Sequence, residues 1–465
     1  MKLAKSLLLG SAATLVATAG YAADLPSKKA APVNYVKVCD AYGAGFFYIP
    51  GTDTCVKLGG RVRSDYAFSG KQDLYSGGTI DRTSGAKVNT VTSLAEGQNL
   101  YGWEVRGRVD FDARTATAYG TAQAVASLRL ARTSGTLDVN GPNASSTAAG
   151  ATLEAAYIRF AGFTFGVAKD NFAFMPSTFY GAGHWGSFAN GAKQIAYTAV
   201  LGGGFSATVA VQDMTDTTLG ASAIQTSTSS YYNGMPQING RVDFDQAWGT
   251  ASVMAAVGQA KAVNTVATLA YDKSETTWAV GGGLKLNLPM IAAGDVLWLN
   301  AAYADGMTEY TTNWSSFKSS DTKRVVGGYV VNHPSWVVAA GGIETVKSWN
   351  AAAVFTHFWA PQWRHSFLAS YGKVEGTTAS KAVTFGSTGA FGDATVWNIG
   401  TQLAFLPTSN FEIGVDVLYA RVEQDVRRAG TGTGTGFCVA ATDASCVTKE
   451  KTGNWTGRLR VERTF

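Results

Sequence analysis

The segment Tyr101–Arg114 alternates between two kinds of side chain along its whole length. Its odd positions are apolar or small, from Tyr101 and Trp103 to Ala113, whereas most of its even positions are charged, from Glu104 to Arg114. Because successive side chains of a β-strand point to opposite faces, this segment is expected to be a strand with one apolar and one charged face. Such a strand fits a soluble sandwich with its apolar face inside. It equally fits a membrane barrel, with its apolar face toward lipid and its charges toward water.

The same alternation recurs along the chain and predicts an all-β fold. Sixteen strands are predicted, over residues 55–68, 100–114, 118–132, 151–161, 163–170, 193–201, 204–213, 237–245, 248–260, 276–288, 295–304, 347–359, 362–375, 393–406, 409–422 and 452–465. All ten prolines lie outside these segments, as expected for residues that cannot donate to a strand ladder. The connections alternate between short and long, so all long loops lie at one end of the sheet. This asymmetry favours a transmembrane antiparallel up-and-down β-barrel over a sandwich.

The first residues have the pattern of an export signal. Lys2 and Lys5 precede a short apolar stretch, and small residues, among them Gly20 and Ala22, precede Ala23. A membrane anchor helix is the alternative, but glycine, serine and threonine interrupt the apolar stretch, and no later segment approaches the roughly 20 apolar residues that a membrane helix needs. We therefore expect a signal peptide at 1–22, a periplasmic N-terminal segment at 23–54 and a transmembrane barrel with external loops at 55–465.

The four cysteines form two local pairs, Cys39 with Cys55 and Cys438 with Cys446. An even number of cysteines in an exported protein indicates disulfides. Metal ligation is the alternative, but neither pair has a neighbouring histidine or a Cys-x-x-Cys spacing. The sequence therefore predicts two structural disulfides.

The chain ends in another alternating strand, WTGRLRVERTF, whose apolar face is interrupted by Arg463 and closes on the aromatic Phe465. That ending resembles the assembly signal of outer-membrane barrels. The mature start ADLPSKK, the segment CDAYGAGFFYIPGTDTCVKLGGRVR, the hairpin-rich body and Phe465 together resemble the porins of alphaproteobacterial outer membranes. The resemblance implies a sixteen-stranded general-diffusion porin, normally a trimer, whose long third loop folds into the channel.

Closing the barrel would bring the last strand beside the first and group their charged faces. An arginine on the lipid face costs several kcal/mol at the membrane midplane, so these side chains are expected to face the lumen. The predicted pore-lining or constriction residues are Arg61, Arg63, Arg106, Arg108, Arg114, Arg129, Arg458, Arg460, Asp65, Asp110, Asp112 and Asp170. Two interpretations stay open: the charges pair only to stabilise the wall, as cross-strand pairs do, or the arginines also polarise the pore.

The loop after the fifth predicted strand, NFAFMPSTFYGAGHWGSFANGA at 171–192, is too apolar for a free surface loop. Its aromatic residues and Met175 suit packing against the inner wall of a barrel too wide for side chains to fill. In the family this loop often brings acids opposite the arginines, but here it has none, and Asp170 is the nearest. The sign of the preferred ion is therefore not set by the sequence.

Enzymatic signals are weak. The four histidines, at 184, 333, 357 and 365, show no metal-binding spacing, and the tract GTGTGTG at 430–436 lacks the lysine and helix of a phosphate loop. We therefore expect a passive channel for small hydrophilic solutes and ions, with no catalytic residue, metal or cofactor. The expected partners are outer-membrane lipid, lipopolysaccharide and two further copies of the chain, and the small net charge of +5 does not suggest nucleic acid. The alternatives are an outer-membrane barrel enzyme and an adhesive or structural barrel with a plugged lumen.

Overall fold

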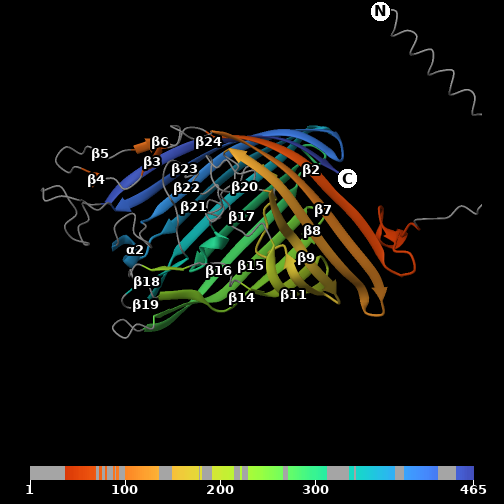
Figure 1. Ribbon diagram of the computed structural model, residues 1–465, viewed down its shortest axis with the longest axis horizontal. Helices are drawn as coiled ribbons and strands as arrows, with labels where there is room; N and C mark the ends of the chain where they lie inside the picture. Colours follow the sequence, from red (N-terminus) through yellow and green to blue (C-terminus); the bar gives the residue numbers. More distant parts are fainter. Residues whose placement is uncertain are drawn as a thin grey trace, which may run out of the picture.

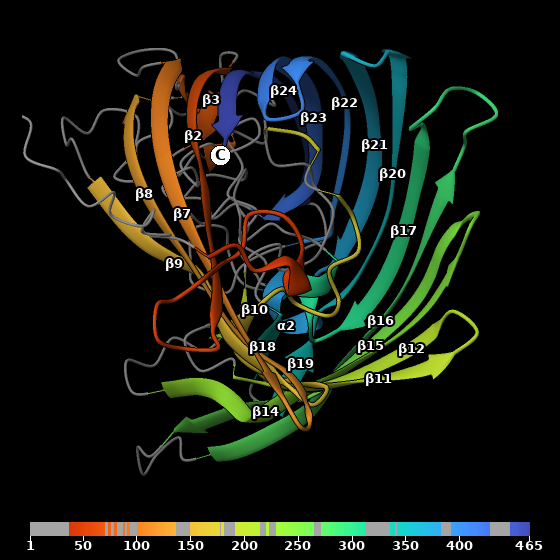
Figure 2. The same cartoon turned by 90° about the vertical axis from the view of Figure 1, so that its right-hand side faces the viewer.

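The computed structural model describes residues 37–69, 73–75, 79–80, 87–88, 91–93, 100–135, 149–176, 178–180, 191–213, 220–222, 229–264, 271–311, 335–339, 342–382, 392–427 and 447–465. Sixteen antiparallel strands form its barrel (Figures 1 and 2). They are β2 (Cys55–Ser69), β7 (Tyr101–Thr117), β8 (Gly120–Gly135), β9 (Ala149–Phe160), β10 (Phe163–Ala168), β11 (Ala192–Gly202), β12 (Phe205–Asp213), β14 (Ser229–Gln246), β15 (Gly249–Asn264), β16 (Tyr271–Asn287), β17 (Val296–Asp305), β20 (Lys347–Ala360), β21 (Trp363–Glu375), β22 (Ala394–Thr408), β23 (Phe411–Arg427) and β24 (Val447–Thr464).

The barrel closes where its first and last strands meet. β2 pairs with β7 on one side and with β24 on the other, in both cases antiparallel. The terminal residue extends this seam, because the backbone N–H groups of Phe465 and Gly60 each donate to the other residue's carbonyl oxygen at 3.0 Å. The predicted fold class, the number of strands and their order along the chain are confirmed.

The strand boundaries differ from the prediction at the ends that carry the long loops. β14 begins at Ser229 rather than at 237, and β24 begins at Val447 rather than at 452. Ladder pairing continues into these segments although the apolar alternation of the sequence has faded. Two prolines predicted to lie outside strands lie inside them, Pro236 in β14 and Pro407 in β22. Both lie at shifts in strand register, where a residue without an N–H group leaves no ladder position unfilled.

The two faces of the wall differ as the alternation predicts. On β7, Trp103 is 51% exposed on the outer face, whereas its neighbour Glu104 is 5% exposed on the inner face. The outer face elsewhere carries similar apolar side chains, including Leu130, Ile195, Val253 and Leu459. The apolar surface of this barrel therefore points outward.

Smaller elements lie at the two ends of the barrel. At one end the 3₁₀ helix η1 (Asp40–Tyr42) and β1 (Phe47–Tyr48) form a segment stapled by the disulfide Cys39–Cys55, and β1 pairs with β2 (Figure 1). At the other end the long connections contribute β3 (Asp73–Tyr75), β4 (Thr79–Ile80), β5 (Lys87–Val88), β6 (Val91–Ser93), β13 (Gly220–Ser222), the 3₁₀ helix η2 (Thr308–Tyr310), β18 (Trp336–Ala339), β19 (Gly342–Thr345) and α2 (Thr378–Ala382). In the described part of the chain, no helix has the length and apolar character needed to cross a membrane.

Three of these strands form a small sheet of their own. β13 pairs parallel with β18, and β18 pairs antiparallel with β19. Figure 2 shows β18, β19 and α2 within the ring of barrel strands. Their buried residues Val337 and Val338 pack against apolar side chains of β15 and of β21–β23. The long connections thus supply a second layer inside one end of the barrel, which the sequence pattern did not predict.

Candidate functional site

The inner face of β24, β2, β7, β8 and β9 forms a charged wall. Its centre is Glu154 of β9, whose carboxylate lies 3.8 Å from Arg106, 3.4 Å from Arg108 and 3.3 Å from Arg129. Arg106 also pairs with Glu104 at 2.6 Å, and Arg108 pairs with Asp110 at 2.9 Å. Arginines from two neighbouring strands therefore share one carboxylate on a third.

A second cluster adjoins it across the seam of the barrel. Asp65 of β2 is fully buried and accepts hydrogen bonds from Arg460 at 2.7 and 2.8 Å. Arg63 and Arg458 each lie 3.6 Å from the same carboxylate. Glu462 lies 3.7 Å from Arg61 and 3.9 Å from Arg63. The structure therefore brings together the predicted arginines of β24, β2, β7 and β8, with the exception of Arg114.

Arg114 and Asp112 lie nearer the end of β7. They pair with each other at 2.7 Å, and the Arg114 guanidinium lies 4.8 Å from the centre of the Phe46 ring in the disulfide-stapled segment. Arg114 is in register with Cys55, the first residue of β2. Arg114 thus contacts the N-terminal segment, and Asp112 pairs with it outside the cluster around Glu154.

The short repeat GRVDFD builds the same arrangement twice. In the β7–β8 hairpin, Arg108 pairs with Asp110, which accepts a hydrogen bond from Ser127 across the ladder. In the β14–β15 hairpin, Arg241 pairs with Asp243 at 2.8 Å, and Ser252 donates to that carboxylate. The repeat therefore places an arginine–aspartate pair on two separate parts of the inner face.

The segment after β10 packs against the inner face on a different side of the barrel. Phe172 and Phe174 are 3% and 5% exposed and lie against two glycines of β16. A Cβ atom built at Gly281 would lie 2.9 Å from the Phe172 ring, and one built at Gly283 would overlap the Phe174 ring. Each aromatic ring thus occupies space that only glycine leaves free.

A basic side chain fixes the backbone of the same segment. The Arg241 guanidinium donates to the carbonyl oxygen of Ala173 at 3.1 Å and lies 5.6 Å from the centre of the Phe174 ring. The Trp298 ring of β17 contacts the other edge of Phe174, with ring centres 5.3 Å apart. The start of the segment is therefore held by hydrogen bonds and by ring contacts together.

The far end of the segment contacts β22, β23 and β24. The Tyr180 hydroxyl donates to Glu412, which Arg364 also binds at 3.0 Å. The Tyr180 N–H donates to Asp416 at 2.6 Å, and the Arg460 guanidinium lies 4.3 Å from the centre of the Tyr180 ring. A side chain at Gly414 would overlap the Tyr180 hydroxyl. The predicted apolar residues Phe172, Phe174, Met175, Phe179 and Tyr180 are all buried, whereas Trp185 lies outside the described residues.

Asp170 does not face open lumen. Its side chain is 2% exposed, and it accepts hydrogen bonds from the Phe172 N–H at 2.6 Å and from Gln212 of β12 at 3.0 Å. Burial raises the pKa of this carboxyl to about 6. Asp170 was predicted from the sequence to line the pore. In the structure it fixes the turn that begins the segment after β10.

Several residues of this site were missed by the sequence analysis. Glu154 lies at a β-bulge, because Ser127 pairs with Ala155 while Leu128 pairs with Leu153, and a bulge redirects a side chain in a way that simple alternation does not predict. Arg241 and Asp243 could have been found, because the GRVDFD repeat carries them. The glycines that receive the aromatic rings gave no signal, since nothing in a sequence distinguishes a glycine that receives a ring from any other strand glycine.

The described residues contain no group of three or more histidine, cysteine, aspartate or glutamate side chains placed to hold a metal ion. His357 and His365 lie opposite each other on β20 and β21, while His184 and His333, like Cys438 and Cys446, lie outside the described residues.

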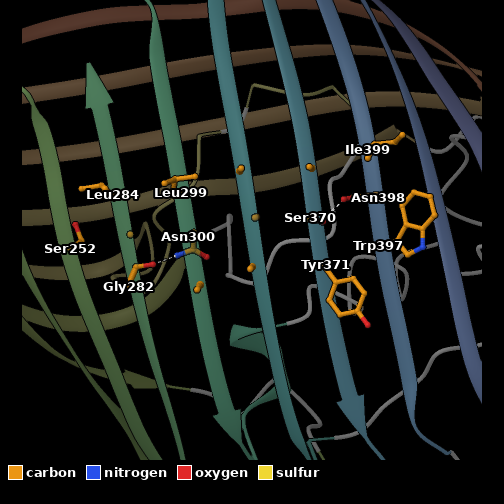
Figure 3. Close-up of a pocket in the computed structure, with 16 residues that line it drawn as sticks. Ser252, Gly282, Leu284, Leu299, Asn300, Ser370, Tyr371, Trp397, Asn398 and Ile399 are labelled. Carbon is orange, nitrogen blue, oxygen red and sulfur yellow. Dashed lines mark hydrogen bonds between the residues drawn. The ribbon is translucent and has the colours of Figure 1, made fainter. Parts of the chain in front are cut away.

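An open groove of about 750 Å³ lies over β16, β17 and β20–β22, where Leu299, Tyr371 and Ile399 of the outer face border it (Figure 3). Small residues, among them Gly282 and Ala301, form its floor, and its lining includes no charged side chain. A hydrophilic solute would find no ionic partner there.

Comparisons with known proteins agree with this geometry. The sequence matches the model of the Porin subfamily over residues 24–449. It is 30% identical to porin Omp2b of Brucella abortus (strain 2308) over 356 residues, which cover 71% of this chain and 85% of the relative. It is 32% identical to porin Omp2b of Brucella neotomae over 319 residues, covering 65% and 75%. The crystal structure of the outer membrane channel DcaP of Acinetobacter baumannii shares the fold with a TM-score of 0.57 at 15% identity, covering 90% of this chain and 99% of that one.

Proposed function

Because the chain belongs to the Porin subfamily and is a diffusion channel of the bacterial outer membrane, we propose that small hydrophilic solutes and ions cross it past a polarised constriction. The charged wall forms one side of this constriction, and the segment after β10 forms the other. The proposed activity needs no chemical step, catalytic residue or cofactor. The protein's contribution is the width and the electrostatic potential of the path.

One observation carries the proposal, the unequal number of charges on the wall. In its clusters around Glu154 and Asp65, seven arginines lie beside five carboxylates, which leaves two positive charges in excess. The residues are Arg61, Arg63, Arg106, Arg108, Arg129, Arg458 and Arg460 against Asp65, Glu104, Asp110, Glu154 and Glu462. Charge concentrated on a wall with low-dielectric surroundings raises the local concentration of counter-ions. The excess therefore attracts anions and opposes cations.

The segment after β10 supplies the narrowing. A sixteen-stranded barrel is too wide for its own side chains to fill. Residues 170–176 contact β12, β14, β16 and β17, and residues 178–180 contact β22–β24, so the two ends of the segment lie on different parts of the inner face. We propose that this third long connection lies across the lumen and leaves the solute path against the charged wall.

Further parts of the proposal concern export and assembly. Residues 1–22 are the signal peptide, residues 23–54 lie in the periplasm with the Cys39–Cys55 disulfide, and Cys438–Cys446 is a second disulfide in the last external loop. Phe465 is the assembly signal, and its place at the barrel seam fits that role. The chain assembles as a trimer in contact with lipid and lipopolysaccharide, as the family resemblance implies. Mass measurement in detergent tests the trimer.

The ionic part of the proposal is tested by the reversal potential in planar bilayers under a salt gradient. The test variant carries Arg106→Gln with Arg108→Gln. Its matched control is Arg132→Gln, because Arg132 of β8 is exposed and lies in register with Val105 of the outer face. The control removes the same kind of charge from the same hairpin but from outside the lumen.

The double variant should shift the reversal potential toward cation preference, and the control should leave it unchanged. An unshifted potential in the double variant, with steady open-channel current, would place the constriction away from Glu154. A folded barrel without steady current would instead contradict the channel itself.

A further inference from the structure

A second connection, the one after β17, also turns inward and reaches the segment after β10. Met307 and Tyr310 are 2% and 1% exposed, and they belong to the same apolar cluster as Phe172 and Phe174. The Tyr310 ring packs on the Phe172 ring with centres 4.3 Å apart. Phe172 is therefore enclosed between Gly281 of the wall on one side and Tyr310 on the other.

Hydrogen bonds join the same two connections. The Tyr310 hydroxyl shares its one proton between two amide oxygens, that of Gln237 at 2.9 Å and that of Gln212 at 3.3 Å. Gln212 in turn donates to Asp170 at 3.0 Å, and Asp170 accepts the N–H of Phe172. A buried donor or acceptor left without its partner costs free energy, so this chain of bonds resists separation of its members.

The connection after β17 is itself fixed to the barrel. The Gly306 N–H donates to the carbonyl oxygen of Val346 at 3.0 Å, and the Thr311 and Ser348 hydroxyls lie 2.5 Å apart. Ser335 donates to Glu309 at 2.8 Å and lies 2.9 Å from the Thr308 hydroxyl. Residues 307–311 are thus held by Ser348 of β20 and by Ser335, and they can support what packs against them.

We propose that residues 307–311 form a brace for the segment after β10, the constriction segment. Tyr310 is the positioning residue of this brace and acts through Phe172. The brace fixes the start of the segment at 170–174, and the contacts of Tyr180 fix its far end. The inference rests on the proposed function, because it takes the segment after β10 to set the width of the path. Without the brace, Phe172 keeps its place against Gly281 but loses the ring and the hydrogen-bonded chain on its other side.

The test measures single-channel conductance, current noise and exclusion of neutral polymers of graded size in planar bilayers. Tyr310→Ala removes both the ring contact and the hydroxyl, whereas Tyr310→Phe removes only the hydroxyl and keeps the ring. Tyr303→Ala is the matched control, because Tyr303 lies on β17 in register with Val280 of the outer face. Heat-dependent mobility in gels verifies that each barrel is folded.

The brace predicts that Tyr310→Ala raises the conductance, the noise and the size limit, that Tyr310→Phe does so to a smaller extent, and that Tyr303→Ala changes none of them. A double-mutant cycle tests the route through Phe172. In a Phe172→Ala background, Tyr310→Ala should add little further change. Full additivity of the two substitutions would show that Tyr310 does not act through Phe172 and would overturn the inference.

A further variant separates this inference from the proposed function. Phe174→Ala loosens the constriction segment at a ring that packs against Gly283 and Trp298 of the wall. If Phe174→Ala raises the conductance while Tyr310→Ala leaves it unchanged, the brace is wrong and the constriction stands. If neither variant changes the conductance of a folded barrel, the segment after β10 does not set the width of the path, and both proposals fall.

Discussion

The inner face of the barrel has two regions that share one strand geometry and differ in their side chains. On β24, β2, β7, β8 and β9 the inward positions are arginines and carboxylates, whereas on β15–β17 and β20 they include Met254, Ala256, Ala302 and Val354. The first region leaves Arg108, Arg129 and Glu154 partly exposed, and the second is covered by the connections after β10 and β17. An inward position therefore tells whether a side chain faces the interior, but not whether it meets solvent or protein.

The largest expected difference between the regions is in stability. Phe174→Ala should reduce the stability of the loop-covered region by about 3–5 kcal/mol, because it empties a packed site against Gly283 and Trp298. Arg129→Gln in the charged region should cost about 1 kcal/mol or less, since its partly exposed ion pair is screened. Denaturant unfolding of both variants in detergent measures the difference. Equal losses would show that the two regions are packed alike.

An arginine introduced on the outer face of the wall should destabilise the barrel, whereas the inner face tolerates one. Val109→Arg places a guanidinium on the lipid face and should destabilise the barrel by about 2–4 kcal/mol near the midplane. Ser206→Arg is the control, because Ser206 faces inward beside Asp243. Refolding equilibria in lipid vesicles compare the two. A Val109→Arg barrel as stable as the control would mean that this face does not contact acyl chains.

A smaller effect is expected from the carboxylate at the centre of the charged wall. Glu154→Gln frees Arg106, Arg108 and Arg129 from their shared partner and adds one positive charge. At about 8 Å in water a unit charge favours an anion and disfavours a cation by roughly 0.5 kcal/mol each, so the anion-to-cation permeability ratio should rise about sixfold. The reversal potential under a salt gradient measures this change. A shift toward cations would contradict the assignment of Glu154 to the solute path.

The smallest expected effect is a pH dependence of the stability with which the loop-covered region is packed. Burial raises the pKa of Asp170 to about 6 and that of Glu309 to about 7. The charge of Lys169 lowers the pKa of Asp170, and the charge of Asp170 raises the pKa of Glu309. Tyr310 lies beside both carboxyls. A raised carboxyl pKa means that the packed state favours the protonated forms, so its stability is highest below about pH 4, where the unpacked carboxyls are protonated too, and is lost as pH rises to about 6 to 7.

Current noise should therefore increase modestly between pH 5 and pH 8. Asp170→Asn combined with Glu309→Gln should remove the increase, because neither amide titrates. If the double variant keeps the full pH dependence of the original chain, the dependence arises elsewhere.

The sequence predicted the number and order of the strands and most of the charged wall. Period-two alternation survives in every membrane strand, because one face must suit lipid and the other water. The cost of an arginine in lipid then assigns the face of Arg61, Arg108 and Arg460 without any structure. The disulfide Cys39–Cys55 was correctly expected on a separate ground, the even number of cysteines in an exported chain.

The remaining features depend on contacts that have no sequence period. Glu154 enters the arginine cluster through a bulge, and Gly281 and Gly283 matter only because Phe172 and Phe174 pack on them. The apolar character of the segment after β10 showed that it would be covered, but not by what. Nothing in the sequence around Tyr310 indicated that a second connection would meet it.

The contrast between the two regions is tested by the accessibility of cysteines placed at inward positions of each, Arg129→Cys in the charged region and Ala256→Cys in the loop-covered region. A small anionic methanethiosulfonate reagent is added to open channels in a planar bilayer. It should react with the Arg129→Cys variant and lower its current within minutes, and it should leave the Ala256→Cys variant unmodified, because Ala256 is 5% exposed beneath the connections. Equal reaction at both positions, or reaction only in the Ala256→Cys variant, would contradict the assignment of the solute path to the charged wall.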